Sequence, residues 1–285
     1  MNRRVLVPTA TLLVAAVLAG LGTLLYSSHQ HQRSFITVVD PGEPAVAFAH
    51  VVAQRFDANA QRIELRVDVV PLPGNADQRD PEAFARELTI RTSSPSTPML
   101  RYQAGQRTAE QTLLLPIFEG PITDYPVDRY TTTLELAAEY SGEPVALRMD
   151  FSNTETLFDA TARTGGSSGA ASFLELSVTR SPGTLVLAWF MVAAMWALVL
   201  VVAGAAAVLI IQRRGLVWPA LGWMAATLFA LVGLRNAAPG SPPIGSLIDY
   251  AAFFWAEALI AIALVAAVLA GIAVDTQPKK TSASS

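Results

Sequence analysis

Residues 173–211 read FLELSVTRSPGTLVLAWFMVAAMWALVLVVAGAAAVLII and contain both kinds of structural element that this chain predicts. Residues 174–178 alternate between apolar and polar side chains, which is typical of a strand with one buried face. Residues 185–211 contain no charge, and a helix of this length can cross the roughly 30 Å hydrocarbon core of a bilayer. Because little more than Ser181-Pro182-Gly183 lies between the predicted strand at 173–180 and this stretch, we expect a β-domain that leads directly into a membrane helix.

Three further stretches, residues 5–26, 218–234 and 250–274, are also apolar enough to cross a bilayer. Lipid offers no water to backbone amides, so each of these stretches has to be a helix. The sequence therefore predicts a membrane protein with about four transmembrane helices and an additional polar domain. We divide it into an N-terminal helix at 1–28, a polar domain at 29–181, a three-helix region at 182–275 and a tail at 276–285.

The first apolar stretch leaves two interpretations open. It follows a basic start, as a secretory signal peptide does, but its apolar run is longer than the usual core of about 7–15 residues. The following Tyr26-Ser27-Ser28-His29 offers no clean cleavage pattern of small residues. We therefore expect an uncleaved signal anchor, with cleavage as the alternative, and both place the polar domain outside the cell.

Basic residues flank the apolar stretches in three places and predict their orientation, because cytoplasmic loops carry an excess of Lys and Arg. With four helices, all three basic pairs fall on one side of the membrane: Arg3 and Arg4, Arg213 and Arg214, and Lys279 and Lys280. We therefore predict a multi-pass protein of the plasma (inner) membrane, with both termini in the cytoplasm and residues 29–181 outside.

Short alternating segments fill the polar domain and predict an all-β, sandwich-like fold. Apolar side chains alternate with polar or charged ones at 63–69, 130–136 and 147–151. Turn residues such as Pro, Gly and Asn separate these segments at fairly even spacing. The Gly- and Ser-rich residues 160–171 are instead expected to form a mobile loop.

The composition of the polar domain excludes several classes of function. Residues 32–180 contain 13 arginines and 20 acidic residues, and an acidic domain is repelled by nucleic acid. The chain has no cysteine, which excludes thiolate nucleophiles, iron–sulfur clusters and thiolate zinc sites. The histidines His29, His31 and His50 form no dyad or metal pattern, and we place His50 in the core. We predict no catalytic residue, no metal site and no cofactor.

The densest local signature of the polar domain is Tyr125-Pro126-Val127-Asp128-Arg129-Tyr130. Pro126 fixes its φ angle just before a predicted strand. Asp128 can cap the turn through its side-chain oxygen, and Tyr130 then points inward. We interpret Tyr125, Pro126, Asp128 and Tyr130 as a structural corner, with a ligand site as the alternative.

Glu257, Asp249 and Arg235 are charged residues in or beside the last two apolar stretches. Glu257 lies inside the final stretch, where a charge costs several kcal/mol unless it is paired or hydrated. Asp249 shares its helix face, and Arg235 ends the preceding stretch on the same outer side. We predict that Arg235 pairs with Glu257 or Asp249 and joins the two helices. The functional alternative is that Glu257 carries a proton or an ion.

The region between these two stretches resembles part of a known family. Residues 234–245 read LRNAAPGSPPIG, followed by Asp249-Tyr250 and then FFWAE at 253–257. With residues 125–130, and with one helix before the polar domain and three after it, the chain resembles a family of uncharacterised four-pass membrane proteins. That family is common in actinobacteria and carries a domain of unknown function. The resemblance implies an envelope location and an extracytoplasmic β-domain, and it implies no activity or substrate.

The sequence leaves three functions open. We expect first a non-enzymatic binding, scaffold or accessory subunit of the cell envelope. Its partners would be the lipid bilayer and either another envelope protein or a second copy of the chain. The alternative is a transporter or channel subunit that uses Glu257 within the membrane. The second alternative is an envelope enzyme that uses acidic residues of the outer domain.

Overall fold

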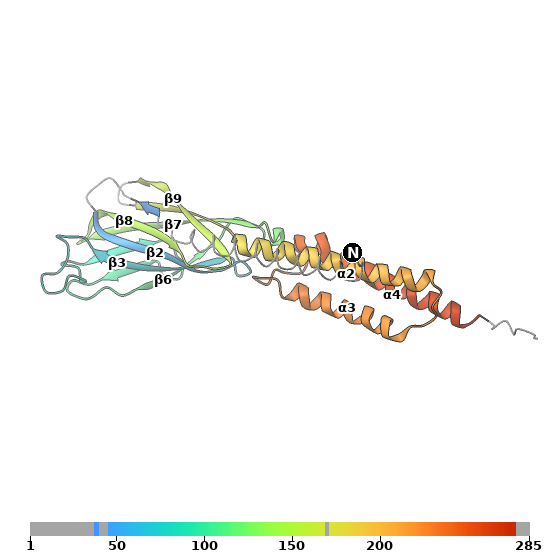
Figure 1. Cartoon of the computed structure of the whole chain (residues 1–285). Coiled ribbons are helices and arrows are strands. Elements are labelled where there is room, and N and C mark those ends of the chain that lie inside the picture. The colour runs from blue at the N-terminus through green and yellow to red at the C-terminus, as the bar shows by residue number, and fades with distance from the viewer. Residues whose placement is uncertain (1–36, 40–44, 169–170, 278–285) are drawn as a thin grey trace, which may run out of the picture. The chain divides into compact units, whose positions relative to one another are not determined.

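The computed structural model describes residues 37–39, 45–168 and 171–277, and it divides the chain into two compact units (Figure 1). The first, here called the β unit, consists of Met1–Pro121 and Val127–Thr184. The second, here called the helical unit, consists of Ile122–Pro126 and Leu185–Ser285. The expected N-terminal helix at 1–28 lies outside the described residues, as do Lys279 and Lys280 of the tail.

Ten strands are present in the described part of the β unit. In chain order they are β1 (Thr37–Val39), β2 (Ala45–Asp57), β3 (Arg62–Pro71), β4 (Leu88–Thr92), β5 (Met99–Tyr102), β6 (Gln111–Pro116), β7 (Arg129–Tyr140), β8 (Glu143–Asn153), β9 (Phe158–Ser168) and β10 (Ala171–Arg180).

The strands form one continuous, barrel-like sheet. Five of them follow one another in the order β1-β8-β2-β3-β6, and the other five in the order β9-β10-β7-β4-β5. β7 and β8 form an antiparallel hairpin that joins the two sets. All neighbours are antiparallel except β2 and β8, which run parallel. The structure therefore confirms the predicted β-sheet domain.

The alternation of side chains explains why these segments are strands. In β3, Ile63, Leu65 and Val67 are buried, whereas the intervening Glu64 and Arg66 remain partly exposed. β7 and β10 follow the same period of two over their whole lengths. These three strands thus contribute one apolar face each to the interior, and burial of that surface is the main favourable term in folding.

The predicted mobile loop at 160–171 is wrong, because its described residues up to Ser168 belong to β9. This strand pairs with β10 from Phe158 opposite Arg180 to Ser168 opposite Ala171. Ala160 and Ala162 lie in the core. Gly and Ser have low strand propensity, but strand preference depends on context, and pairing with β10 overrides the local composition here.

The outer edge of β6 is covered by hydroxyl groups from the loop that precedes β5. Ser94 Oγ donates to the carbonyl oxygen of Leu114 over 2.8 Å, and Thr97 Oγ1 donates to that of Thr112 over 3.4 Å. An exposed strand edge is a template for pairing with another chain. These side chains occupy carbonyl groups that such an added strand would need.

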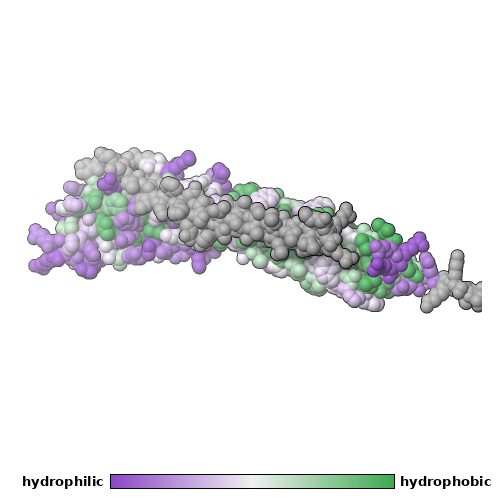
Figure 2. Space-filling model, viewed as in Figure 1, coloured by the Kyte–Doolittle hydropathy of each residue, from purple (hydrophilic) through white to green (hydrophobic). Residues whose placement is uncertain are grey.

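Three long apolar helices are present in the described part of the helical unit. They are α2 (Pro182–Ile211), α3 (Trp218–Asn236) and α4 (Phe254–Asp275), and the short π-helix η2 (Asp249–Phe253) leads into α4. α2, α3 and the combined helix Asp249–Asp275 are each long and apolar enough to cross a membrane. They coincide with the predicted stretches 185–211, 218–234 and 250–274. Figure 2 shows hydrophobic residues gathered over the helices and hydrophilic residues over the strands.

Local capping explains why α2 starts immediately after β10. Ser181 Oγ accepts a hydrogen bond from the Thr184 backbone N–H over 3.3 Å, as a residue that caps a helix N-terminus does. Pro182 occupies the first helical position, where its missing N–H costs nothing. The Thr184 hydroxyl also donates to the carbonyl oxygen of Leu157 over 3.0 Å. The direct passage from strand to helix that residues 173–211 predict is therefore present.

Candidate functional site

Antiparallel pairing of β7 with β10 brings a carboxylate and a guanidinium together inside the β unit. Thr179 lies opposite Arg129 in the register of these strands, so Asp128, just before β7, meets Arg180 at the end of β10. Arg180 Nε lies 3.0 Å from each carboxylate oxygen of Asp128, and Arg180 Nη2 lies 2.9 Å from Oδ2. Asp128 is 2% exposed and Arg180 is 3% exposed, so the pair is withdrawn from water.

Tyr130 and Phe158 complete what we call the Asp128 cluster, which comprises Asp128, Tyr130, Phe158 and Arg180. The Tyr130 hydroxyl donates to Asp128 Oδ2 over 2.6 Å, and the guanidinium carbon of Arg180 lies 4.2 Å from the centre of the Phe158 ring. Burial, and then the hydrogen bond to Asp128 and its negative charge, raise the pKa of Tyr130 above its ordinary value. The phenol therefore stays protonated and keeps donating to the carboxylate.

The sequence signature at 125–130 identified only part of this cluster. Tyr130 points inward, and Asp128 lies beside it, but the carboxylate binds Arg180 and Tyr130 in place of the expected turn cap. Arg180 lies 52 residues further along the chain. No local pattern identifies it, because only the pairing of β7 with β10 brings it to Asp128.

Tyr125 and Pro126, from the same signature, belong to the helical unit. They follow the 3₁₀-helix η1 (Ile122–Asp124), and the peptide bond between them is cis. The Tyr125 side chain is buried in a cluster with Ala188, Met191, Ala238 and Ile248. The predicted corner is therefore divided, with its first two residues packed in the helical unit and Asp128 and Tyr130 in the β unit.

A second buried ion pair joins α3 to η2 in the helical unit. Arg235 Nε lies 2.8 Å from Asp249 Oδ1, and Arg235 Nη2 lies 2.8 Å from Asp249 Oδ2. Arg235 is 6% exposed and Asp249 is fully buried. Of the two partners that the sequence left open for Arg235, the structure places Asp249 beside the guanidinium.

The Pro- and Gly-rich loop between α3 and η2 supplies the remaining partners of this pair. Arg235 donates from Nη1 to the carbonyl oxygen of Pro242 over 3.0 Å and from Nη2 to that of Pro243 over 2.9 Å. The Gly245 backbone N–H donates to Asp249 Oδ2 over 2.8 Å. Both charges are thus hydrogen-bonded on several sides, as a charge held away from water requires.

Glu257 lies in the first turn of α4, after η2, and its side chain is partly exposed on the helix surface. It makes no ion pair with any residue that the structure describes. In η2, which leads into α4, the carbonyl oxygen of Ala251 accepts a hydrogen bond from Trp196 Nε1 of α2 over 3.2 Å. The helices are therefore joined at η2 by Arg235 and Trp196, and Glu257 takes no part in either contact.

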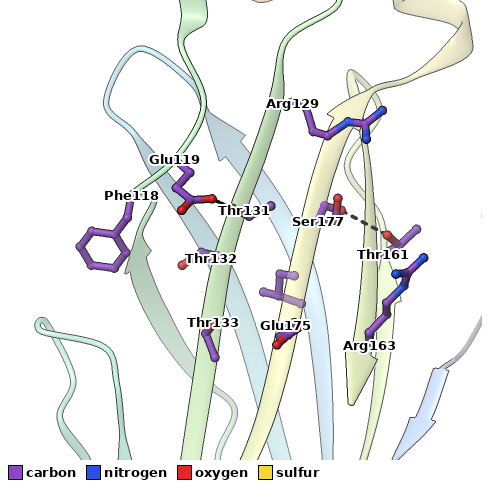
Figure 3. A pocket seen from close by; sticks show the side chains of 11 residues that line it. Phe118, Glu119, Arg129, Thr131, Thr132, Thr133, Thr161, Arg163, Glu175 and Ser177 are labelled. Atoms are coloured by element: carbon purple, nitrogen blue, oxygen red, sulfur yellow. Dashed lines mark hydrogen bonds between the residues drawn. The ribbon is translucent and has the colours of Figure 1, made fainter. Parts of the chain in front are cut away.

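A groove of about 790 Å³ crosses the outward faces of β7, β9 and β10 in the described β unit (Figure 3). We call it the hydroxyl groove, because Thr131 and Thr133 of β7, Thr161 of β9 and Ser177 of β10 line it. Thr131, Ser177 and Thr161 lie directly opposite one another in the strand register. This groove was not predicted from the sequence. The local pattern that points to it is the alternation in β7, which places Thr131 and Thr133 on the outward face.

Charged residues of both signs surround these hydroxyls. Glu175 of β10 lies opposite Arg163 of β9, and Arg129 starts β7. Glu119, in the segment after β6, accepts a hydrogen bond from the Thr131 hydroxyl over 2.7 Å. The groove therefore presents two cations, two anions and a row of hydroxyl groups, all of which can exchange hydrogen bonds with a ligand.

The contacts of His50 contradict the prediction that this residue lies in the core. His50 is not a core residue, because it lies on the outward face of β2, where its Nδ1 is 2.9 Å from Asp150 Oδ1 of β8. Among the described residues, no group of three His, Cys, Asp or Glu side chains is arranged to hold a metal ion.

Comparison with known families divides the chain at the end of β10. The domain of unknown function DUF4436 matches residues 37–179, about half of the chain. A second domain of unknown function, DUF8686, matches residues 180–274. The first match corresponds to the strands and the second to the three apolar helices. No curated protein matches the chain.

The Asp128 cluster yields a prediction about stability. Asp128→Ala should lower the free energy of unfolding of the β unit by about 3–5 kcal/mol, because it removes the carboxylate that balances the buried Arg180 guanidinium. Glu139→Ala, which breaks an exposed pair with Arg91, serves as the control and should cost at most about 1 kcal/mol. Chemical unfolding of the full-length protein in detergent measures both. Equal losses of unfolding free energy in the two variants would contradict a larger contribution from the buried pair.

The helical unit yields a second prediction. Asp249→Asn should destabilise this unit by about 3–5 kcal/mol, because Arg235 then keeps only neutral partners in a buried site. Glu257→Gln should change stability by less than about 1 kcal/mol, since Glu257 is outside the ion pair. Thermal unfolding in detergent compares the two variants. A larger loss for Glu257→Gln than for Asp249→Asn would contradict the assignment.

Proposed function

This chain belongs to the family of the domain of unknown function DUF4436, and on that premise we propose that it is a non-enzymatic binding subunit of the cell envelope. In this proposal it is a multi-pass protein of the plasma membrane. Its β-domain, at residues 29–181, lies outside the cytoplasm and binds another envelope component.

The apolar helices support the membrane part of the proposal. α2, α3 and Asp249–Asp275 have the length and composition of membrane helices, and residues 5–26 add a fourth apolar stretch at the sequence level. Arg213 and Arg214 follow α2, and the rule that cytoplasmic loops are rich in basic residues assigns this turn to the cytoplasm. The β-domain, at the other end of α2, then lies outside.

The hydroxyl groove is the observation that carries the binding function. A groove of about 790 Å³ lies within the size range of roughly 300–1,000 Å³ that is usual for ligand sites. Apart from Glu119, its hydroxyl and charged groups come from three paired strands, so the sheet holds them in a defined arrangement. Sites on strands are more exactly positioned than sites on loops.

The buried charged groups support binding over catalysis. The Asp128 carboxylate is directed to Arg180 and Tyr130, and the Asp249 carboxylate to Arg235 and Gly245. Catalytic acids and bases need to reach a substrate, and these two carboxylates are turned to partners of their own unit. Candidate binding groups of the described β unit are therefore sought on its surface, where the hydroxyl groove gathers charged and hydroxyl side chains.

The location can be tested with single cysteines, because the chain contains none of its own. Gln103→Cys in the β unit and Ile244→Cys in the α3–η2 loop should react with a membrane-impermeant maleimide in intact cells. Gln212→Cys, after α2, should react only once the membrane is permeabilised. All three positions are exposed. Labelling of Gln212→Cys in intact cells, with Gln103→Cys protected, would reverse the proposed orientation.

The binding function can be tested by photo-crosslinking in living cells. A photoreactive amino acid in place of Thr133, inside the groove, should capture an envelope component on irradiation. The same substitution at Thr89, on the outward side of β4, is the matched control and should capture little. Equal capture at both positions, or no capture at Thr133, would contradict the assignment of the groove as the binding face.

A further inference from the structure

We propose that the hydroxyl groove binds a neutral carbohydrate chain. This inference rests on the proposed binding function and names the chemical class of its ligand. Three properties of the groove lead to it: balanced charge, a row of hydroxyl groups across three strands, and an exposed aromatic ring at its margin (Figure 3).

The charge balance argues against a strongly charged ligand. Residues 32–180 carry a clear excess of acidic over basic residues, but the groove contains Arg129 and Arg163 against Glu119 and Glu175. An acidic polymer would meet the two glutamates, and a basic one would meet the two arginines. A neutral ligand with many hydroxyl groups can instead hydrogen-bond to groups of both signs.

The hydroxyl row matches the hydrogen-bonding chemistry of sugars. Thr131, Ser177 and Thr161 lie side by side on β7, β10 and β9. Thr131 donates to Glu119, and Thr161 donates to the carbonyl oxygen of Ser177, so both hydroxyl oxygens keep lone pairs to accept from a ligand. Neighbouring strands lie about 4.8 Å apart, a spacing comparable to that of successive sugars in an extended polysaccharide.

Phe118 supplies the apolar contact that sugar rings use. Its side chain is 82% exposed, and it lies at the margin of the groove next to Glu119 (Figure 3). A single exposed aromatic residue is ordinary on a protein surface. Beside a groove of hydroxyl and charged groups, however, this exposed ring offers an apolar surface of the kind that the C–H face of a pyranose ring contacts.

The face of the sheet also favours a carbohydrate over a peptide. An extended peptide commonly binds by adding a strand to a free sheet edge, where backbone groups are unpaired. The groove lies over the central part of the β7-β10-β9 pairing, where the backbone of β10 is bonded on both sides. A ligand centred over β10 meets side chains, whereas a peptide that adds a strand would have to lie at the outer edge of β9, which pairs only with β10 among the described strands.

Neutral sugar chains reach this groove from two sources, which are cell-wall polysaccharide and the headgroup of a glycolipid. Both present the same ring hydroxyls and C–H faces. The test therefore has two arms with full-length protein in lipid nanodiscs. One arm screens an array of soluble neutral oligosaccharides that includes chitotetraose, cellotetraose and maltotetraose. The other uses vesicles of phosphatidylcholine with and without digalactosyl diacylglycerol.

Two groove variants and two matched controls make the test specific. Phe118→Ala and Arg163→Ala should weaken binding of the neutral sugar by about tenfold or more, as loss of a central contact does. Met99→Ala and Arg101→Ala change a partly exposed apolar residue and an exposed arginine of β5, and should leave binding unchanged. All four should retain the unfolding temperature of the wild type.

Binding in the soluble arm alone identifies wall polysaccharide, and binding in the vesicle arm alone identifies a glycolipid.

Several outcomes would overturn the inference. These are no binding of any neutral sugar in either arm, binding that Phe118→Ala and Arg163→Ala leave intact, or groove-dependent binding only of tetragalacturonate or an unstructured peptide. The crosslinking experiment at Thr133 separates this failure from that of the proposed function. If Thr133 captures an envelope component while no neutral sugar binds, the groove is a binding face for another ligand class. If neither occurs, both proposals are wrong.

Discussion

The antiparallel pairing of β7 with β10 is the constraint on which the rest of the β unit depends. Successive side chains of a strand point to opposite faces, so a shift of one residue in register would exchange the two faces. In the observed register, Tyr130, Leu134, Leu174 and Val178 face the core. The same register aligns Thr131 with Ser177 on the outside and brings Asp128 to Arg180 at the end of the strands. The buried ion pair and the hydroxyl groove are thus two consequences of one strand pairing.

Both units contain the same kind of buried ion pair, in which a guanidinium binds a carboxylate through two nitrogen atoms at a site closed to water. Arg forms such two-point contacts because its planar fork matches the geometry of a carboxylate. A buried pair of this kind adds little net stability compared with apolar packing, but it penalises every arrangement that separates its members. Arg180 therefore ties the end of β10 to the start of β7, and Arg235 ties the end of α3 to the loop and η2.

Charged side chains occupy two kinds of position in the described part of this protein, buried ion pairs and the exposed groove. Its buried ionic groups are paired inside their own unit, whereas the groove presents Arg, Glu, Thr and Ser side chains to solvent. Family matches to two domains of unknown function cover the strands and the apolar helices, and they carry no activity that could be transferred to the chain. The proposed binding function therefore depends on the chemistry of the groove, whose hydroxyl and charged groups suit a polar, uncharged ligand.

Length and periodicity alone locate the three described apolar helices and most strands, because both signals are local: a run of about 20 apolar residues, or an alternation with a period of two. Local sequence patterns also identified Asp128, Tyr130, Arg235 and Asp249 as candidate residues. They failed at β9, where Gly and Ser residues form a strand only because β10 pairs with them. The partner of Asp128, the choice of Asp249 over Glu257, and the groove required the folded chain, since each depends on segments that strand register or a loop brings together from distant parts of the sequence.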